Sequence, residues 1–86
     1  MQIIYSGQFE KDYKKLSVET KKQFKRKIKL LVRNPRHPSL RTKKIQGTGS
    51  IFESTINMGI RMTWQFVEDG FYLRNIGPHD RTLNNP

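Results

Sequence analysis

Residues 59–82, GIRMTWQFVEDGFYLRNIGPHDRT, decide the fold because they form the pattern of two antiparallel strands joined by a tight turn. Apolar residues alternate with polar ones from Ile60 to Phe66, which is the period of a strand with one buried face. Glu68-Asp69-Gly70 is a turn signal, and we expect a second strand from Phe71 to Ile76. The stretch therefore predicts a hairpin whose apolar face packs on the rest of the chain.

The residues before the hairpin predict a strand, two helices and a further strand. Residues 2–5 favour extended structure, and Ser6 and Ser17 are suitable N-caps for two successive helices. Asn34-Pro35 ends the second helix, because the residue before a proline avoids the helical conformation. Residues 35–41 and 41–46 are expected to be a loop and a partly extended basic connector. Residues 51–57 are the next expected strand.

The resulting order, β-α-α-β-β-β, predicts an α+β fold in a single domain that spans residues 1–86. Tight turns make the last three strands antiparallel neighbours, and the two N-terminal helices are expected to cover one face of their sheet. The opposite sheet face is expected to be open and polar, with Glu53, Arg61, Thr63, Gln65 and Arg74 on it. The expected core is Phe9, Tyr13, Leu16, Phe24, Ile28, Leu31, Ile60, Met62, Trp64, Phe66, Phe71 and Leu73. The apolar stripe of the second helix extends to Val18 and Val32, with Leu30 off the stripe.

The chain is strongly basic. Seventeen Lys and Arg residues against seven Asp and Glu residues give a formal net charge of +10. Such a surface attracts polyanions by long-range steering and counterion release. Nucleic acid or an acidic protein is therefore the expected partner.

Several features limit the class of protein. The 86 residues contain no cysteine, so disulfides and thiolate metal sites are excluded. The two histidines are far apart in the sequence and give no metal-ligand spacing, so we expect no metal or other cofactor. The first residues lack a signal-peptide pattern, and no stretch approaches the roughly 20 apolar residues of a membrane span. We expect a cytoplasmic protein with no membrane contact.

A histidine at a strand end, close to arginines, suits acid/base chemistry on a phosphate. His79 follows the second hairpin strand, and its imidazole suits either proton transfer of RNA cleavage. Arg61 and Arg74 are candidates to hold the phosphate through their guanidinium forks. Glu53 is a candidate base for the 2′-OH, a group that orients one of these arginines, or a salt-bridge partner of a neighbouring strand. Lys43 and Lys44, in the basic connector, are expected to rim the open sheet face.

Several short stretches, taken in order, carry a family resemblance. They are Phe9…Tyr13…Leu16, the basic second helix, NPRHPSL (34–40), Lys44-Ile45-Gln46-Gly47, GIRMTWQF (59–66) and IGPHD (76–80). Together they resemble the RelE/ParE superfamily of bacterial toxins, most of all its ribonuclease branch with the RelE, YafQ and YoeB types. The resemblance implies a RelE-like fold, in which two N-terminal helices pack on a small antiparallel sheet.

The resemblance also implies a function. Toxins of this branch enter the ribosomal A site and cut mRNA, leaving a 2′,3′-cyclic phosphate, and an acidic antitoxin blocks them. We therefore expect an endoribonuclease that inhibits translation by metal-independent attack of the 2′-OH. Its expected partners are the ribosome, mRNA and a cognate antitoxin, and its expected state is a monomer or a toxin–antitoxin hetero-oligomer.

The resemblance assigns roles by position. Arg61 matches the family's phosphate-binding arginine, and His79 matches the general acid or base near the C-terminus. Arg74 lies about where RelE types carry a second phosphate-stabilising arginine. The basic residues expected to contact RNA are Arg41, Lys43, Lys44 and Arg81. The sequence departs from the family pattern in two ways. Asp80 stands where the YoeB type has a tyrosine. The acidic base, which the family carries in the loop before the second strand, has no clear counterpart, since Glu53 lies on the strand itself.

Other functions are compatible with the same sequence. One is a ParE-type toxin that poisons DNA gyrase without cutting RNA, which would need no proton-transfer histidine. Another is a basic RNA-binding domain, or a toxin that has kept the fold and lost its activity. A plain RNA-binding domain predicts exposed aromatic rings for base stacking. Trp64, Phe66 and Phe71 have core-facing parity instead, although Tyr72 is available.

Overall fold

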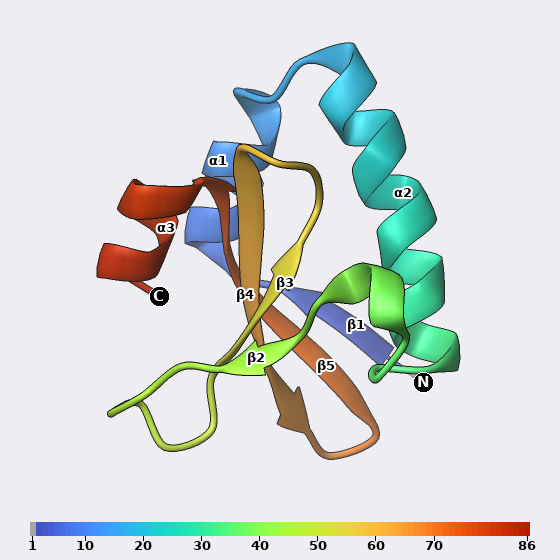
Figure 1. The fold of residues 1–86 in the computed structure, drawn as a ribbon, viewed down its shortest axis with the longest axis vertical. Helices are drawn as coiled ribbons and strands as arrows, with labels where there is room; N and C mark the ends of the chain where they lie inside the picture. Colours follow the sequence, from blue (N-terminus) through green and yellow to red (C-terminus); the bar gives the residue numbers. More distant parts are fainter. Residues whose placement is uncertain (1) are drawn as a thin grey trace.

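The computed structural model describes residues 2–86. Its elements follow each other in the predicted order, with a short 3₁₀ helix, a two-residue strand and a C-terminal helix in addition (Figure 1). They are β1 (Gln2–Tyr5), α1 (Gly7–Lys14), α2 (Val18–Arg33), η1 (Pro38–Leu40), β2 (Lys43–Lys44), β3 (Phe52–Thr55), β4 (Ile60–Val67), β5 (Gly70–Pro78) and α3 (His79–Asn84). The predicted α+β class with a mainly antiparallel sheet is confirmed.

The five strands form one sheet in the order β1-β5-β4-β3-β2. β1 pairs with β5 in parallel, and every other pair is antiparallel. Thr63 pairs with Asn75 and Trp64 with Leu73, so Arg74 is an extra residue in β5 at a bulge. The bulge returns Ile76 to the face that carries Leu73, which is why the apolar residues of β5 are not in strict alternation.

The two N-terminal helices begin at the predicted serines. The side-chain oxygen of Ser6 accepts a hydrogen bond from the backbone N–H of Phe9 at 2.9 Å, and that of Ser17 accepts one from Thr20 at 3.1 Å. α2 ends at Arg33, directly before Asn34-Pro35, as predicted. Among residues 2–86, no helix is long and apolar enough to cross a membrane.

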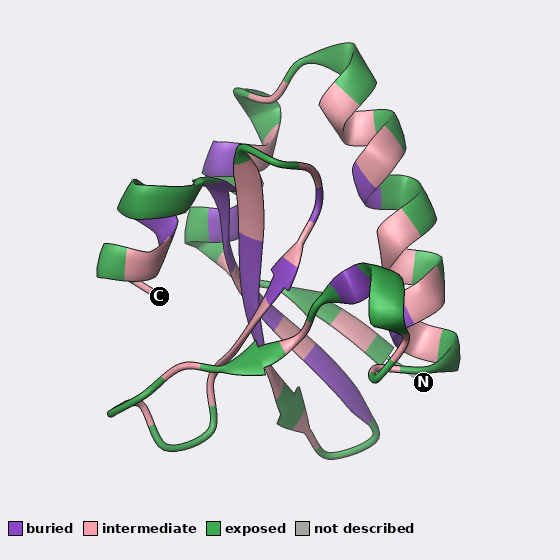
Figure 2. Cartoon of the chain, viewed as in Figure 1, coloured by how far each residue is buried: buried purple, intermediate pink, exposed green. Residues whose placement is uncertain are grey.

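The core lies between the sheet and helices α1 and α2. It contains most of the predicted residues, but the placement of Phe66 in the core is wrong, because 54% of its surface is exposed. Val18, which begins the predicted apolar stripe of the second helix, is 71% exposed. Val18 opens α2, and Phe66 is the penultimate residue of β4. Figure 2 shows the buried residues concentrated in the sheet and on parts of the helices, with exposed residues at the start of α2. Leu30, placed off the stripe by its spacing, packs against the core, and Leu40 and Ile56 are fully buried although the sequence pattern did not select them.

The second face of the sheet is not open, which corrects the prediction. Figure 1 shows α3 on the opposite side of the sheet from α2, and α3 contacts both β4 and β5. Thr63, expected on an open face, is completely buried. Its hydroxyl donates to the carbonyl of Pro86 at 3.0 Å, and Asn75 donates to the carbonyl of Asn85 at 3.1 Å. The C-terminal segment therefore covers part of the polar face by pairing with its side chains.

Candidate active site

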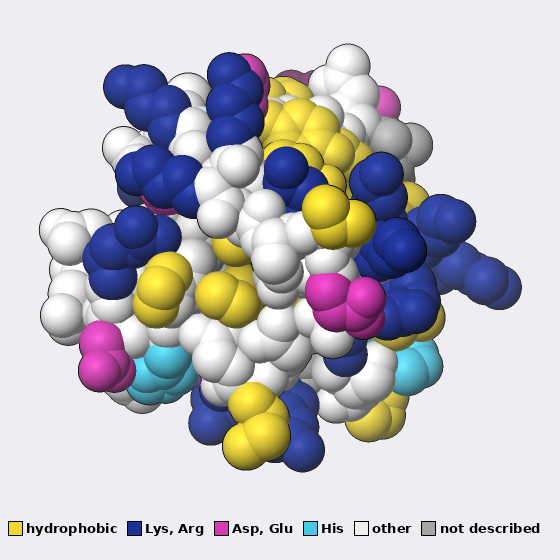
Figure 3. Space-filling view, turned by 90° about the horizontal axis from the view of Figure 1, so that it is seen from above, with side chains coloured by type: hydrophobic (Ala, Val, Ile, Leu, Met, Phe, Trp, Pro, Cys, Tyr) yellow, Lys and Arg dark blue, Asp and Glu magenta, His cyan; other side chains and the backbone are white. Residues whose placement is uncertain are grey.

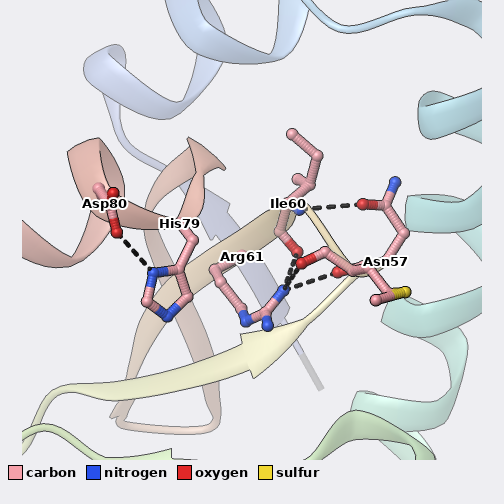
Figure 4. A network of polar contacts seen from close by, with 6 residues as sticks. Asn57, Ile60, Arg61, His79 and Asp80 are labelled. Carbon is pink, nitrogen blue, oxygen red and sulfur yellow. Dashed lines mark hydrogen bonds and ion pairs between the residues drawn. The ribbon is translucent and has the colours of Figure 1, made fainter.

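Arg61 lies at the start of β4, where a tight turn holds its side chain. Its Nη1 donates to the carbonyl oxygens of Asn57 at 2.7 Å, Met58 at 3.0 Å and Ile60 at 3.3 Å (Figure 4). The side-chain oxygen of Asn57 in turn accepts from the backbone N–H groups of Gly59 and Ile60, each at 2.9 Å. These contacts fix the guanidinium to its own turn through one nitrogen. Within residues 2–86 its Nε and Nη2 donate no hydrogen bond, so this edge can bind an anion.

The same turn holds His79. Its backbone N–H donates to the carbonyl of Gly59 at 3.1 Å, and the preceding Pro78 pairs with Ile60 across the hairpin. His79 is therefore anchored at the end of the β4–β5 hairpin away from its turn. It comes two residues after Gly77, which pairs with Arg61. Figure 4 shows the imidazole and the guanidinium extending from these adjacent backbone positions. The structure thus brings together the two residues that were predicted to carry the chemistry.

Asp80 orients the His79 ring. Its Oδ1 lies 3.0 Å from Nδ1 of His79, while half of the histidine side chain and nearly all of the aspartate side chain are exposed. With a proton on Nδ1, the bond to the carboxylate leaves Nε2 to accept a proton from a substrate, and the imidazolium can return it. Because solvent screens so exposed a pair, its main effect is on the direction of the ring.

The guanidinium groups of Arg74 and Arg81 are engaged with other parts of the chain. Nε of Arg74 donates to the carbonyl of Pro86 at 3.1 Å, and its Nη1 donates to Gln65 at 2.7 Å. Nη2 of Arg81 lies 4.0 Å from Oδ1 of Asp12, a buried carboxylate of α1. These contacts tie the C-terminal segment to β5 and to α1.

The basic connector is divided between the two faces of the sheet. Lys43 pairs with Glu53 and Lys44 with Phe52, and neighbouring positions on a strand point to opposite faces. Both lysines are exposed, as is Arg41. Glu53 lies on the face of Arg61, two residues along β3 from Thr55, which pairs with Arg61. Within residues 2–86 it forms no ion pair, so the salt-bridge interpretation of Glu53 is wrong.

Positive charge is spread widely, with apolar side chains gathered in patches between Lys and Arg side chains (Figure 3). One apolar groove of about 370 Å³ lies between β1, α1 and α2 and is lined by Tyr5, Tyr13 and Phe24, with Lys14 and Lys25 at its rim. Partial burial there raises the pKa of the Tyr5 hydroxyl above 10.0, and the neighbouring Tyr13 adds to the shift. Within residues 2–86, no group of three or more His, Cys, Asp or Glu side chains is placed to hold a metal ion.

Two residues that shape the site, Asn57 and Asp80, were not among the predicted site residues. Asn57 was assigned only to a turn, yet its side chain builds the turn beneath Arg61 and its Nδ2 donates to Gln23 of α2 at 2.8 Å. An Asn two residues before a Gly is a signal for such a side-chain-capped turn. Asp80 was noted only as a departure from a family pattern, although its position next to His79 in the sequence allows the contact.

Comparisons with known proteins identify the fold. No protein-family model matches the sequence, and no curated protein matches it. Among solved structures, YafQ in the E. coli DinJ–YafQ complex is 18% identical, with a TM-score of 0.75 over 93% of this chain and 94% of that chain. RelE in the Methanococcus jannaschii RelB–RelE complex is also 18% identical, with a TM-score of 0.77 over 96% and 99%. The YoeB/ParE toxin from Agrobacterium tumefaciens is 12% identical, with a TM-score of 0.79 over 92% and 99%.

The chain therefore has the α+β fold of small toxins from toxin–antitoxin systems. More narrowly, its fold is the RelE-like fold shared by the YafQ, YoeB and RelE structures, as the sequence resemblance implied. At these identities the likeness concerns the fold, and the chemistry has to be argued from the side chains.

Proposed function

We propose that this protein is the toxin of a toxin–antitoxin pair and inhibits translation by cutting mRNA on the ribosome. The observation that carries the proposal is the Gly59–His79 backbone hydrogen bond. It holds a half-exposed histidine beside β4, in which the anchored Arg61 is the second residue. A proton-transfer group next to a phosphate-binding group is what metal-independent RNA cleavage requires.

In the proposed reaction the 2′-oxygen of a nucleotide attacks the adjacent phosphorus, and the bond from phosphorus to the 5′-oxygen breaks. The 2′-OH loses a proton, and the leaving oxygen gains one. Arg61 stabilises the charge on the phosphate through the guanidinium edge that its turn leaves open. His79 carries out one proton transfer, and Glu53, on the face of Arg61, is the candidate for the other. General acid–base catalysis of this kind contributes typically about 10²- to 10⁴-fold.

The ribosome is proposed to supply the geometry of the reaction. The site is exposed, and Arg74 and Arg81 are engaged with other parts of the chain. Few side chains are thus left to hold an RNA strand in line for attack, and correct positioning accounts for much of a catalysed rate. We therefore expect slow cleavage of free RNA.

The proposed second partner is an acidic antitoxin. The net charge of +10 favours an acidic protein. The groove between α1 and α2 combines apolar rings with a lysine rim, which suits a segment with both apolar and acidic side chains. The YafQ and RelE structures with this fold are complexes of the toxins with DinJ and RelB.

The test is induction of the chain in a bacterial host, followed by mapping of mRNA 5′ ends. Wild type is expected to arrest growth and to create in-frame cuts within translated regions, and His79→Ala and Arg61→Ala are expected to do neither while remaining folded. His37→Ala is the matched control, because His37 lies in a loop where its Nδ1 contacts Ser39. Cutting by the His79→Ala variant would refute the assigned role.

A second candidate function is the ParE type, which poisons DNA gyrase. It is favoured by the resemblance in fold to the YoeB/ParE toxin from Agrobacterium tumefaciens. The same experiment separates the two, because a gyrase poison arrests growth while translated mRNA stays intact, and its toxicity does not depend on His79.

A further inference from the structure

A second groove lies on the face of the sheet opposite Arg61. It has a volume of about 300 Å³ and runs between the chain after α2 and the strands β3 and β4. Asn34, Pro35, Arg36 and Thr42 line one side, and the rings of Phe52 and Phe66 line the other. Phe66 lies six residues along β4 from Ile60, roughly 20 Å at 3.3 Å per residue, so this groove is separate from the site at His79.

The aromatic wall of this groove is both exposed and held in place. Phe66 keeps 54% of its surface exposed, although its parity points it to the core face. Its ring stands edge-on against Phe52, with centroids 5.7 Å apart, and against the buried Trp64, with centroids 5.0 Å apart. Phe66 is therefore exposed enough for base stacking, contrary to the expectation from its parity.

Hydrogen bonds fix the opposite wall. The hydroxyl of Thr42 donates to the carbonyl of Pro35 at 3.2 Å and lies 2.8 Å from the hydroxyl of Ser54. Ser54 is buried, and it accepts a hydrogen bond from the indole N–H of Trp64 at 2.9 Å. Because this network already holds both walls in place, little of the protein would have to become ordered when a ligand binds, so the entropic cost of binding is small.

Among the residues that line the groove, the only charged one is Arg36, which is exposed. Lys44 pairs with Phe52, so it shares the face of the sheet to which Phe52 belongs. No Asp or Glu lines this groove, and Glu53 lies on the opposite face, whereas the groove between α1 and α2 includes Glu10.

From these observations we propose that the groove binds one unstacked base of single-stranded RNA, stacked on Phe66, with the adjoining phosphates contacted by Arg36 and Lys44. Every base has a π-face, so stacking on an aromatic ring tolerates sequence, while Arg and Lys neutralise the backbone. This inference rests on the proposed function, because the groove would give the toxin a second RNA-binding site away from His79. RNA binding at this groove can be measured without cleavage.

The test is fluorescence anisotropy of a short fluorescein-labelled oligoadenylate RNA, titrated with the full chain. Phe66→Ala is expected to weaken binding roughly 5- to 150-fold, the range for loss of one stacked base. Phe66→Leu keeps an apolar side chain and lacks the π-face, and it is expected to lose most of the same affinity. Both leave the net charge unchanged, so the slope of affinity against salt should stay that of the wild type.

Val18→Ala is the matched control, because Val18 is also an exposed apolar residue and lies outside the groove. Circular dichroism and thermal unfolding would establish that each variant is folded. The proposal would be overturned if both Phe66 variants bound within twofold of Val18→Ala. It would also be overturned if Arg36→Ala weakened binding no more than Lys29→Ala, since Lys29 lies exposed on α2, outside the groove. His79→Ala should bind normally, so a failure here would be distinct from a failure of the proposed cleavage.

Discussion

Substitution of Gly70 by alanine tests how the first strand is held to the last. Gly70 opens β5 and pairs with Gln2 of the parallel strand β1. A Cβ added at Gly70 would overlap the carbonyl oxygen of Gln2 and would lie 2.8 Å from its carbonyl carbon and 2.9 Å from its nitrogen. All three are backbone atoms, so no change of rotamer relieves the clash, and β1 has to move away from β5.

The expected loss of stability comes from the interactions that are broken when β1 moves away from β5. The N–H of Gln2 donates to the carbonyl of Asp69 at 2.9 Å, and the register next to it pairs Ile3 with Phe71. Loss of about two backbone hydrogen bonds, at roughly 0.5–1.5 kcal/mol each, and partial exposure of Ile3 give about 2–4 kcal/mol. A domain of this length has a total stability of roughly 4–13 kcal/mol, so the loss is a large share of it.

Two other glycines are matched comparisons. A Cβ at Gly77 would overlap Nη2 of Arg81, which is the end of a flexible, half-exposed side chain, and would lie 3.1 Å from Oγ1 of the buried Thr82. Moving the guanidinium weakens its contact with the buried Asp12, which still accepts a hydrogen bond from Gln8, so we expect a loss of about 1–2 kcal/mol. A Cβ at Gly7 meets nothing within 4 Å at the start of α1, so Gly7→Ala should stabilise the fold by up to about 1 kcal/mol.

The assay is urea unfolding followed by circular dichroism, with the three variants compared at equal m-values. The expected order of stability is Gly7→Ala, wild type, Gly77→Ala and then Gly70→Ala. If Gly70→Ala is no less stable than Gly77→Ala, the distinction between backbone and side-chain overlap does not govern this protein, and the reasoning is refuted.

Two more substitutions test the interior of the site and of the core. Asn57→Ala removes the amide oxygen that accepts hydrogen bonds from two backbone N–H groups in the turn beneath Arg61. We therefore expect the free energy of unfolding in urea to fall by about 1–2 kcal/mol and growth arrest to weaken. Full toxicity of this variant would show that the turn does not position Arg61. Trp64→Phe removes the indole N–H that donates to buried Ser54 and leaves a small void, so we expect a loss of about 1–3 kcal/mol. In a double-mutant cycle with Ser54→Ala, additive losses would contradict the assigned bond.

The candidate site was predictable in part. A histidine after a strand end and an arginine at the start of the preceding strand were recognisable from local signals, because a hairpin places the two ends side by side. The positions of Arg74 and Arg81 were not, because their partners, Pro86 and Asp12, are set by how the C-terminal segment folds back. Spacing along one strand carries no information about such contacts.

The sequence by itself determined the elements whose causes are local. The helix starts follow from serines that cap free N–H groups, and the hairpin follows from alternation around the turn that ends at Gly70. Only the tertiary structure decided which apolar residues are covered. Val18 and Phe66 fit the buried pattern and stay exposed, while Leu40 is completely buried, because burial depends on which element packs opposite a residue.

The role of the C-terminal residues was also decided in three dimensions. The alternation of polar residues predicted an open sheet face, yet α3 covers Thr63 and the chain after it binds Asn75. The six residues of α3, from His79 to Asn84, have too little apolar periodicity to predict a helix from the sequence. A helix this short is stable only through its tertiary contacts. The hairpin and the backbone bond to Gly59 anchor His79 at the end of β5, whereas the covering of the polar sheet face depends on long-range contacts that no local pattern encodes.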